Sequence, residues 1–253
     1  MKKRQSKLIR YFSTLLFGFV LFNLIWYALA YLVDMSALPF PKDVYLSYEK
    51  AMSNGIDAHV VASMRRIGLG ILVSLALATI LGVLMGYYAK INRALTPLLY
   101  FSYPLPKLAF LPIIMLLFGI GDLSKILIII LIIVFQITIT IRDAIRNIPK
   151  ENYDVLVSLR ASTLQKVWHV TIPAVLSEVF SSLRIAIGIA LSALFFAESF
   201  GTDEGLGFYI NDSWMRLDYA QMYFGILILS FIGLVLFLIL DWLDFIVHRW
   251  KEK

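Results

Sequence analysis

The chain has 253 residues, of which 60% are hydrophobic and only 16% charged, and its mean hydropathy is +0.81. A soluble domain carries about 25% charged residues, and several apolar runs here are long enough to cross a bilayer, so a soluble globular fold is excluded. The net charge of +6 therefore indicates basic loops beside a membrane and no nucleic-acid partner, and the lack of cysteine excludes disulfides and thiol chemistry.

The first predicted membrane span follows a basic stretch. Residues 1–10 are rich in lysine and arginine, and the uncharged run from 11 to 33 comes directly after them. This run is longer than the roughly 7–15-residue apolar core of a signal peptide, and no small-residue cleavage site follows it. We therefore expect the segment to remain in the chain as a transmembrane helix.

Six membrane spans are predicted in all. Their approximate ranges are 11–33, 67–89, 95–118, 126–141, 175–197 and 223–240. All are expected to be helices, because only a helix satisfies its own backbone hydrogen bonds in hydrocarbon. No alternating ten-residue pattern indicates a membrane barrel. Residues 1–253 are thus expected to form a single all-α transmembrane domain.

The distribution of basic residues predicts the orientation of these helices. If the N-terminus lies inside the cell, the inner segments hold most of the lysines and arginines, including those in 1–10, 142–166 and 249–253. This asymmetry favours both termini on the cytoplasmic side. Most acidic residues then fall outside, and Glu198, at the end of the fifth span, is interpreted as a solvated end group near the outer face.

The second span carries small residues at helical spacing. They are Gly68, Gly70, Ser74, Ala78, Gly82 and Gly86. The last two form a G-x-x-x-G pattern, and small residues at such spacing let helices approach closely. We therefore predict that this face packs against another helix of the same fold.

The third span is crowded with prolines. They are Pro97, Pro104, Pro106 and Pro112. Each removes a backbone hydrogen bond or marks a break, so the span is either a kinked packing helix or an irregular segment that lines a path through the membrane.

Lys107 follows directly after Pro106, and a lysine inside a membrane span is energetically costly unless it is paired with an acid or hydrated. Three roles stay open for Lys107: it snorkels, faces Glu178 or Glu198, or meets an anionic solute.

A half-polar segment, residues 149–173, separates the fourth and fifth spans on the predicted cytoplasmic side. Its apolar residues recur at three- and four-residue steps, which predicts an amphipathic helix from Pro149 to Thr171. Pro173 is expected to end this helix or to kink its entry into the fifth span. Periodicity leaves two interpretations open: the helix lies on the membrane or closes the bundle, or a cytoplasmic partner grips it.

Residues 154–188, DVLVSLRASTLQKVWHVTIPAVLSEVFSSLRIAIG, resemble the EAA loop of ABC importer permeases. Asp154 stands where the family usually has Glu, at a place expected near a helix N-terminus, where the dipole stabilises negative charge. Ala161-Ser162, Ile172-Pro173 and Leu183-Arg184 match the remaining landmarks. Arg160 occupies the usual glycine position. Glycine permits a turn with positive φ between two short helices, and arginine is expected to disfavour it.

Two more stretches support this resemblance. Residues 62–88 and 96–122 are similar to the second and third spans of the branch that includes permeases for sulfonates, taurine, nitrate, bicarbonate and thiamine precursors. The resemblance implies a permease subunit of an ATP-driven importer in a prokaryotic cell membrane. It also implies three kinds of partner besides the bilayer: a second permease copy, two cytoplasmic ATPase subunits and an extracytoplasmic substrate-binding protein. No G-x-x-x-x-G-K-[ST] motif occurs, so ATP and Mg²⁺ are expected only in the ATPase.

Two groups of candidate residues follow from the resemblance and from the membrane pattern. The residues expected to couple the chain to the ATPase are Asp154, Leu159, Arg160, Ala161, Ser162, Gln165 and Pro173. The candidates for the translocation path are Pro104, Pro106, Lys107, Glu178 and Arg184. Because Glu178 and Arg184 are six residues apart, no ion pair between them is expected. Arg184 is expected to meet loop carbonyls or carboxylates near the inner mouth.

Other functions compete with this interpretation. A secondary transporter that works alone is the main alternative, although such carriers usually show more spans and internal repeats. An intramembrane protease would need a serine–histidine or paired-aspartate arrangement within the predicted spans, and the spans contain neither. A metal enzyme is disfavoured as well, because three scattered histidines without cysteine give no metal-ligand spacing. The outer segment 201–214, with its glycines, acids and aromatics, is a re-entrant gate, a landing surface for a binding protein, or an ordinary loop.

Overall fold

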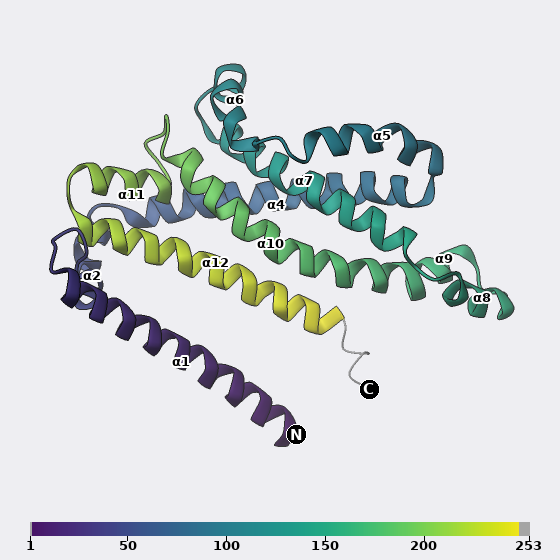
Figure 1. The fold of residues 1–253 in the computed structure, drawn as a ribbon, viewed down its shortest axis with the longest axis horizontal. Coiled ribbons are helices and arrows are strands. Elements are labelled where there is room, and N and C mark those ends of the chain that lie inside the picture. The colour runs from purple at the N-terminus through teal and green to yellow at the C-terminus, as the bar shows by residue number, and fades with distance from the viewer. Residues whose placement is uncertain (1, 248–253) are drawn as a thin grey trace. The chain divides into compact units, whose positions relative to one another are not determined.

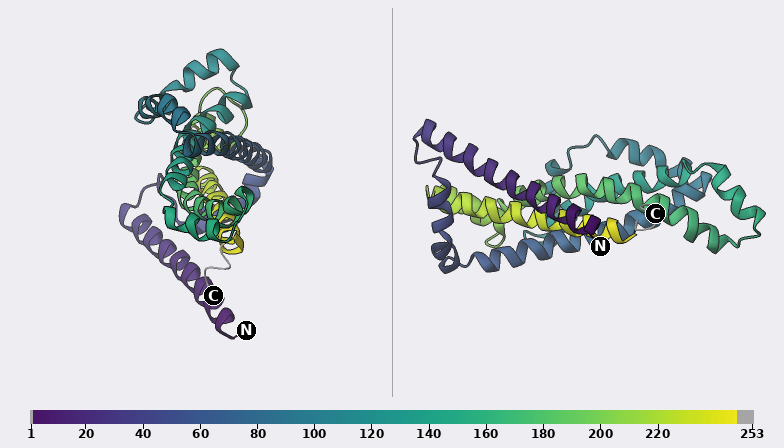
Figure 2. Two further views of the ribbon diagram at one scale, coloured as in Figure 1. Left: turned by 90° about the vertical axis from the view of Figure 1, so that its right-hand side faces the viewer. Right: turned by 90° about the horizontal axis from the view of Figure 1, so that it is seen from below.

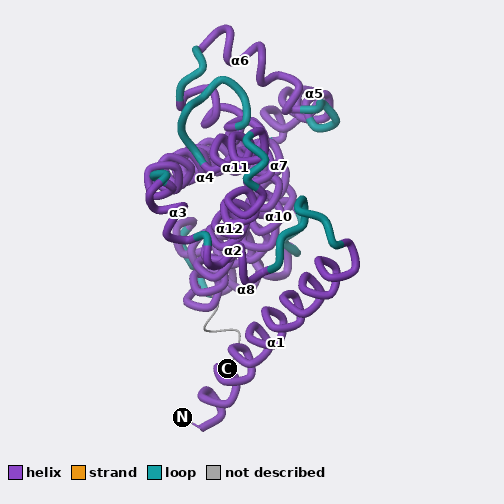
Figure 3. The backbone as a smooth tube through the Cα atoms, turned by 90° about the vertical axis from the view of Figure 1, so that its left-hand side faces the viewer, coloured by secondary structure: helices purple, strands orange, loops and turns teal. Residues whose placement is uncertain are grey.

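The computed structural model describes residues 2–247, and these residues form helices joined by short loops and contain no strand (Figures 1 and 3). The basic residues at 249–253, and the basic side chains at 1–10, lie outside the part that it describes. The longer helices are α1 (Lys2–Val33), α4 (Ile56–Tyr87), α5 (Ala89–Ser102), α7 (Asp122–Arg146), α10 (Ile172–Glu198), α11 (Leu206–Met215) and α12 (Tyr219–Val247). The shorter ones are α2 (Pro41–Leu46), α3 (Tyr48–Ser53), the 3₁₀ turn η1 (Lys107–Phe110), α6 (Leu111–Phe118), α8 (Lys150–Ser158), α9 (Thr163–Lys166) and the π-helical turn η2 (Val167–Thr171).

The predicted spans correspond to helices of the structure. Five described helices are long and apolar enough to cross a membrane, in the ranges Leu16–Val33, Ile56–Tyr87, Asp122–Arg146, Thr163–Glu198 and Tyr219–Val247. A sixth crossing is present if α5 and the following η1–α6 count as one bent span. The described residues therefore confirm the all-α fold class, and α7, α10 and α12 extend beyond the predicted ranges at both ends because their polar ends remain helical.

The predicted third span, 95–118, is broken in the structure. The helical segments Ala89–Ser102 and Lys107–Phe118 meet at an angle of 85°. The break falls at Tyr103–Pro106, where Pro104 and Pro106 cannot donate backbone hydrogen bonds. Pro97, by contrast, lies inside α5 without ending it. Of the two interpretations offered by the prolines, the kinked packing helix is wrong because residues 103–106 are not helical. The segment is irregular as the other interpretation requires, and its place along a path stays a prediction.

The chain divides into two compact units, which are described separately. The first contains the chain up to Asp57 together with Tyr209–Leu227. Within it, Trp26 of α1 donates a hydrogen bond to the Pro39 carbonyl at 3.1 Å and stacks near Tyr223 of α12 at a ring distance of 5.6 Å. Gln221 donates to the Ser47 carbonyl at 3.0 Å. These contacts tie the end of α1, the short helices α2 and α3, and the start of α12 into one body.

The second unit contains Ala58–Phe208 and the chain from Ile228 onward, and its core lies between α7 and α10. The course of these two helices can be followed by colour in Figure 2. One face of α7 is built of isoleucines, and α10 meets it with small residues that allow close approach. The buried residues of these two faces include Ile128, Ile129, Ile133, Ile137, Ile141, Ala186, Ala190, Ala193 and Ala197.

Helix α4 packs against α7 through its glycines. A side chain added at Gly82 would place its Cβ 2.6 Å from the Cβ of Ile141, and one added at Gly86 would lie 2.8 Å from the Cβ of Ile145. Real Cβ atoms do not approach so closely, so only glycine fits at these contacts. The predicted packing role of the G-x-x-x-G face is confirmed.

Candidate functional site

The segment between α7 and α10 folds as two short helices. Helix α8 is followed by a turn at Leu159–Ala161, by α9, and by η2, which runs directly into α10. The prediction of one amphipathic helix from Pro149 to Thr171 is therefore wrong. Residues 150–171 together are called the elbow. Figure 1 shows the elbow beyond the ends of α7 and α10.

The turn of the elbow is built around Arg160 in a left-handed conformation with φ of +54°. The Arg160 amide donates to the Val157 carbonyl and the Ala161 amide to the Leu156 carbonyl, both at 2.9 Å. These two bonds form a Schellman motif, which satisfies the last carbonyls of α8. Arginine thus adopts the conformation that glycine permits, so the turn forms although its central residue disfavours it.

The second helix of the elbow begins at a capping box. The Gln165 amide donates to the Ser162 hydroxyl at 3.3 Å, and the Ser162 amide donates to the Gln165 side chain at 2.7 Å. This reciprocal pair satisfies two of the free amides at the start of α9. Two predicted coupling residues therefore shape the elbow itself. The S-x-x-Q spacing at 162–165 was visible in the sequence as a helix-start signal.

The elbow is attached to the bundle on one side and bare on the other. The hydroxyl of Thr171 is hydrogen-bonded to the Tyr153 hydroxyl at 2.9 Å and to the Tyr87 hydroxyl of α4 at 2.8 Å. In contrast, Leu159 is 73% exposed and Trp168 is 61% exposed. The predicted apolar stripe is thus divided between an inner face that packs and an outer face that does not.

The remaining coupling candidates differ in their surroundings. Asp154 is exposed and is the fifth residue of α8, so its predicted place near the helix N-terminus is wrong, and Glu151 occupies the first turn instead. Pro173 lies in the first turn of α10 and does not end the helix, because the chain enters α10 through the π-helical turn η2. Pro173 also lines a groove of about 510 Å³ with Asn152 and His169.

The candidates for the translocation path do not form one cluster. Lys107 opens η1 and donates a hydrogen bond to the Tyr103 carbonyl at 2.6 Å. Arg184 binds Asp241 of α12 at 2.6 Å and Asp244 at 3.3 Å, so its partners are carboxylates of another helix. Glu178 lines a separate cavity beside Asp143. Of the prolines, Pro106 borders the cavity that also contains Lys107.

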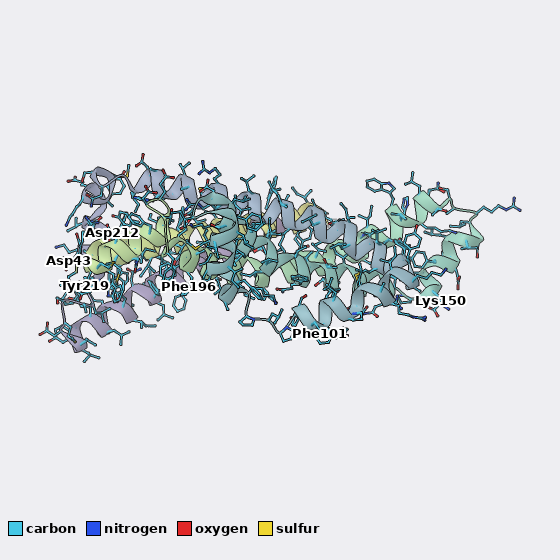
Figure 4. All side chains as sticks on the ribbon, turned by 90° about the horizontal axis from the view of Figure 1, so that it is seen from above. Asp43, Phe101, Lys150, Phe196, Asp212 and Tyr219 are labelled. Carbon is cyan, nitrogen blue, oxygen red and sulfur yellow. The ribbon has the colours of Figure 1, made fainter. Side chains whose placement is uncertain are left out.

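A buried ion cluster lies at the opposite end of the second unit from the elbow. Glu198 is 0% exposed, so the interpretation of a solvated end group is wrong. Its carboxylate accepts hydrogen bonds from Ser63 at 2.8 Å, from Arg66 at 2.8 Å and from the Gly207 amide at 3.0 Å. Figure 4 shows Phe196, close to Glu198, far along the long helices from Lys150, the first residue of α8.

The same cluster holds the segment after α10. Arg66 also binds Asp122 of α7 at 2.7 Å and the Glu204 carbonyl at 2.8 Å, and the Ser63 hydroxyl accepts the Leu206 amide at 2.8 Å. A side chain at Gly205, where φ is +114°, would collide with the Glu198 carboxyl group. The segment from 204 to 207 is thus held against α4 and α10 by hydrogen bonds, a role that was not predicted. The sequence feature that could have predicted this role is the pair Ser63 and Arg66, two polar residues one helical turn apart on an apolar helix.

Among the described residues, no group of three His, Asp or Glu side chains is placed to hold a metal ion. Among the described side chains of the apolar segments, the Lys107 and Lys125 amines donate to backbone carbonyls and are in no ion pair, whereas Arg66, Arg142 and Arg184 each bind a carboxylate. The two polar features that stand out are therefore the exposed elbow and the Lys107 cavity.

Comparison with known proteins gives the family. The model of the family described as "binding-protein-dependent transport system inner membrane component" matches residues 70–253. A formylaminopyrimidine transport permease of Halalkalibacterium halodurans is 26% identical over 93% of this chain and 94% of its own length. A probable ABC transporter permease of Haemophilus influenzae is 33% identical over 76% of this chain and 77% of its own.

A third relative covers less of each chain. The taurine transport permease of Escherichia coli is 31% identical over 70% of this chain and 65% of its own length. The family match begins inside α4 and includes the elbow, the Lys107 cavity and the ion cluster from Asp122 onward. The chain therefore belongs to the family of inner-membrane components of binding-protein-dependent transport systems and is a permease of the ABC transporter class.

Proposed function

We propose that this permease forms one half of the translocation path of an ABC importer, and that a separate cytoplasmic ATPase drives it by gripping the elbow. The observation on which the proposal rests is the bare outer face of the elbow, where Leu159 and Trp168 are exposed between two long membrane helices. An apolar surface next to charged residues is typical of a protein contact site. Arg160 and Asp154 supply those charges.

The elbow is connected to the membrane helices in a way suited to transmit motion. Helix α10 follows η2 without a break, so a displacement of α9 acts directly on a span that ends at Glu198. The Tyr153–Thr171–Tyr87 hydrogen bonds carry the same displacement to α4. Nucleotide binding biases the path only through contacts that differ between the two states of the permease. The exposed coupling residues are the proposed site of those contacts.

The proposal includes the remaining parts of the transporter. The chain lacks a G-x-x-x-x-G-K-[ST] motif, so ATP and Mg²⁺ bind to two ATPase subunits and not to this permease. A second permease copy completes the path, and an extracytoplasmic binding protein delivers the solute. The family description, which names a binding protein, supports the second of these partners. The elbow and both termini face the cytoplasm of a prokaryotic cell. The asymmetry of the basic residues supports this orientation.

The proposed solute is a small polar molecule. The relatives are named as permeases for formylaminopyrimidine, taurine, aliphatic sulfonates, bicarbonate and nitrate. These compounds differ in charge but are all small and water-soluble. An external binding protein makes the first selection among them, and the permease supplies a path of suitable size and polarity.

ATP-driven uptake in proteoliposomes tests this proposal. The permease is reconstituted with its ATPase and its binding protein, and uptake of labelled nitrate, bicarbonate, taurine and formylaminopyrimidine is measured. Leu159→Glu is expected to reduce uptake at least tenfold and to weaken ATPase binding, because it places a charge in the apolar contact. Met35→Glu, the same kind of change at an exposed residue outside the elbow, is the control and is expected to have no effect.

Two results would contradict the proposal. One is uptake by the permease alone, without ATPase or ATP, which would identify a secondary transporter. The other is a Leu159→Glu variant that binds the ATPase and transports as well as the unchanged chain.

A further inference from the structure

A cavity of about 440 Å³ lies where the broken third span meets α7 and α10. Its volume is within the range of small-molecule sites, which is about 300–1,000 Å³. The side chains that matter for its chemistry are Tyr103, Lys107, Phe135, Gln136 and Ser192. They come from three separate elements of the second unit, so the cavity is formed by the fold and not by one helix.

This cavity lies at mid-membrane depth. Gln136 is fourteen residues after Asp122 and ten before Arg146, the two ends of α7. At 1.5 Å per residue it is about 15–21 Å from either end of the helix. The hydrocarbon core of a bilayer is about 30 Å thick, so the lining of the cavity is close to its centre.

The backbone at this depth is not helical. Residues 103–106 connect α5 to η1 through a turn, and an irregular backbone is tolerated inside a membrane only where protein buries it or where it lines a water-filled space. Pro106 and Tyr103 both border the cavity and are exposed. An opening of the cavity to water would satisfy the free backbone groups of this broken span.

The charge of Lys107 also favours a cavity that is open to water. Its amine donates to the Tyr103 carbonyl and lies 5.3 Å from the centre of the Tyr103 ring, which holds the side chain in place. Neither contact neutralises the positive charge, and an ammonium group has three donors. Glu198 binds Arg66 and Ser63, and Glu178 lines another cavity, so the proposed pairing with either acid is wrong.

Gln136 lines the same cavity as this amine. Its amide nitrogen is 3.4 Å from the Ser182 hydroxyl and 3.5 Å from the Ser182 carbonyl, which are long contacts for hydrogen bonds. The amide is therefore held weakly where it is. A cation and an amide donor at the edge of a space lined by Phe135 and Ile189 suit a small molecule with one anionic group.

We propose that this cavity binds the anionic group of the transported solute, a small oxyanion such as a sulfonate, nitrate or bicarbonate, with the Lys107 amine as its counter-ion and the Gln136 amide as a second donor. The proposal rests on the proposed transport function and adds the charge class of the solute. At mid-membrane depth a binding site of this kind stabilises an anion against the cost of leaving water.

Concentration-dependent uptake tests the assignment. In phosphatidylcholine vesicles, which supply no anionic headgroup, ATP-driven uptake of nitrate, bicarbonate and taurine is compared for three lysine variants. Lys107→Met is expected to raise the KM for the transported anion at least tenfold, Lys107→Arg to retain most of the affinity, and Lys90→Met, at an exposed lysine of α5, to change nothing. An unchanged KM in Lys107→Met, or transport of neutral formylaminopyrimidine in preference to the anions, would overturn the assignment.

Thiol labelling tests the cavity without any transport. Because the chain has no cysteine, Gln136→Cys introduces a single thiol. A charged, membrane-impermeant thiol reagent is expected to label it. Nitrate or bicarbonate, added as the anion probe, is expected to slow that labelling at least threefold. Leu77→Cys, on an exposed face at similar depth in α4, is the control and is expected to stay unlabelled. A Gln136→Cys variant that stays unlabelled would overturn the water-filled site. Absence of ATP-driven uptake of every probe would instead count against the proposed function.

Discussion

Glu198 and Arg66 show how single residues bind distant parts of the chain together inside an apolar environment. Their side chains are 0% and 3% exposed, and 132 positions separate them in the sequence. Burying two charges is costly unless they are paired and hydrogen-bonded. Here Ser63, Asp122 and the Gly207 amide satisfy the remaining donors and acceptors, so the cluster is stable only as a whole.

Loss of the Glu198 charge is therefore expected to destabilise the permease. Glu198→Gln leaves Arg66 buried with only part of its counter-charge, which costs about 3 kcal/mol. For a chain of this length that corresponds to a fall in melting temperature of about 6–12 °C, measured by thermal unfolding of the purified protein in detergent. Adding Arg66→Met to the variant is expected to recover part of the loss, because the uncompensated charge disappears.

Asp218→Asn is the matched control for this prediction. Asp218 also forms an ion pair, with Lys50 at 2.5 Å, but the lysine side chain is 61% exposed. Exposed pairs contribute about 1 kcal/mol or less. A Glu198→Gln variant that melts no lower than Asp218→Asn would show that the buried pair is not what holds this end of the molecule together.

At the scale of elements, the elbow depends on one backbone conformation. A left-handed residue other than glycine costs about 1–2 kcal/mol, yet Arg160 adopts it because the Schellman bonds at Arg160 and Ala161 satisfy the end of α8. The capping box at Ser162 then starts α9 directly after the turn. Two terminal motifs placed back to back thus set the angle between the helices.

Substitution of Arg160 is expected to change the protection of these amides. Arg160→Gly removes the left-handed penalty and is expected to preserve or increase protection of the elbow, whereas Arg160→Val, which adds a β-branched residue, is expected to reduce it about tenfold. Hydrogen exchange of the peptide that covers residues 155–165 measures the effect, with a peptide from α12 as the reference. Equal protection in the valine and glycine variants would show that the turn does not depend on this conformation.

The sequence predicted the elements better than their contacts. Long apolar runs identified the spans, and Pro104 and Pro106 marked the break, because both effects act within a few residues. The 85° bend and the cavity beside Lys107 depend on how α7 and α10 pack, which no local pattern shows. The prediction for Glu198 failed for the same reason: its partners on α4 become neighbours only in the folded chain. At Arg160, residue preference pointed away from a turn that the flanking hydrogen bonds stabilise.

At the scale of the molecule, α10 connects the three features of the second unit. The elbow precedes the first residue of α10, Ile172, and Ile189 and Ser192 of α10 line the Lys107 cavity. Glu198, the last residue of α10, belongs to the ion cluster. A movement applied to the elbow therefore reaches the cavity along a continuous helix, while the cluster holds the opposite end. Such an arrangement would let α10 move at its elbow end while its Glu198 end stays held by the ion cluster.

A complete path is expected to require two copies of this chain. Five to six spans from one chain form a thin wall, and the apolar side chains of Leu116 and Leu117 in α6 are exposed. Most symmetric oligomers are two-fold dimers. Native mass spectrometry of the complex with its ATPase is therefore expected to show two permease chains of 28.8 kDa each, and a single thiol at Leu116→Cys to form cross-linked dimers more readily than one at Leu32→Cys, an equally apolar exposed position in α1. An active complex that contains one permease chain would contradict the dimer.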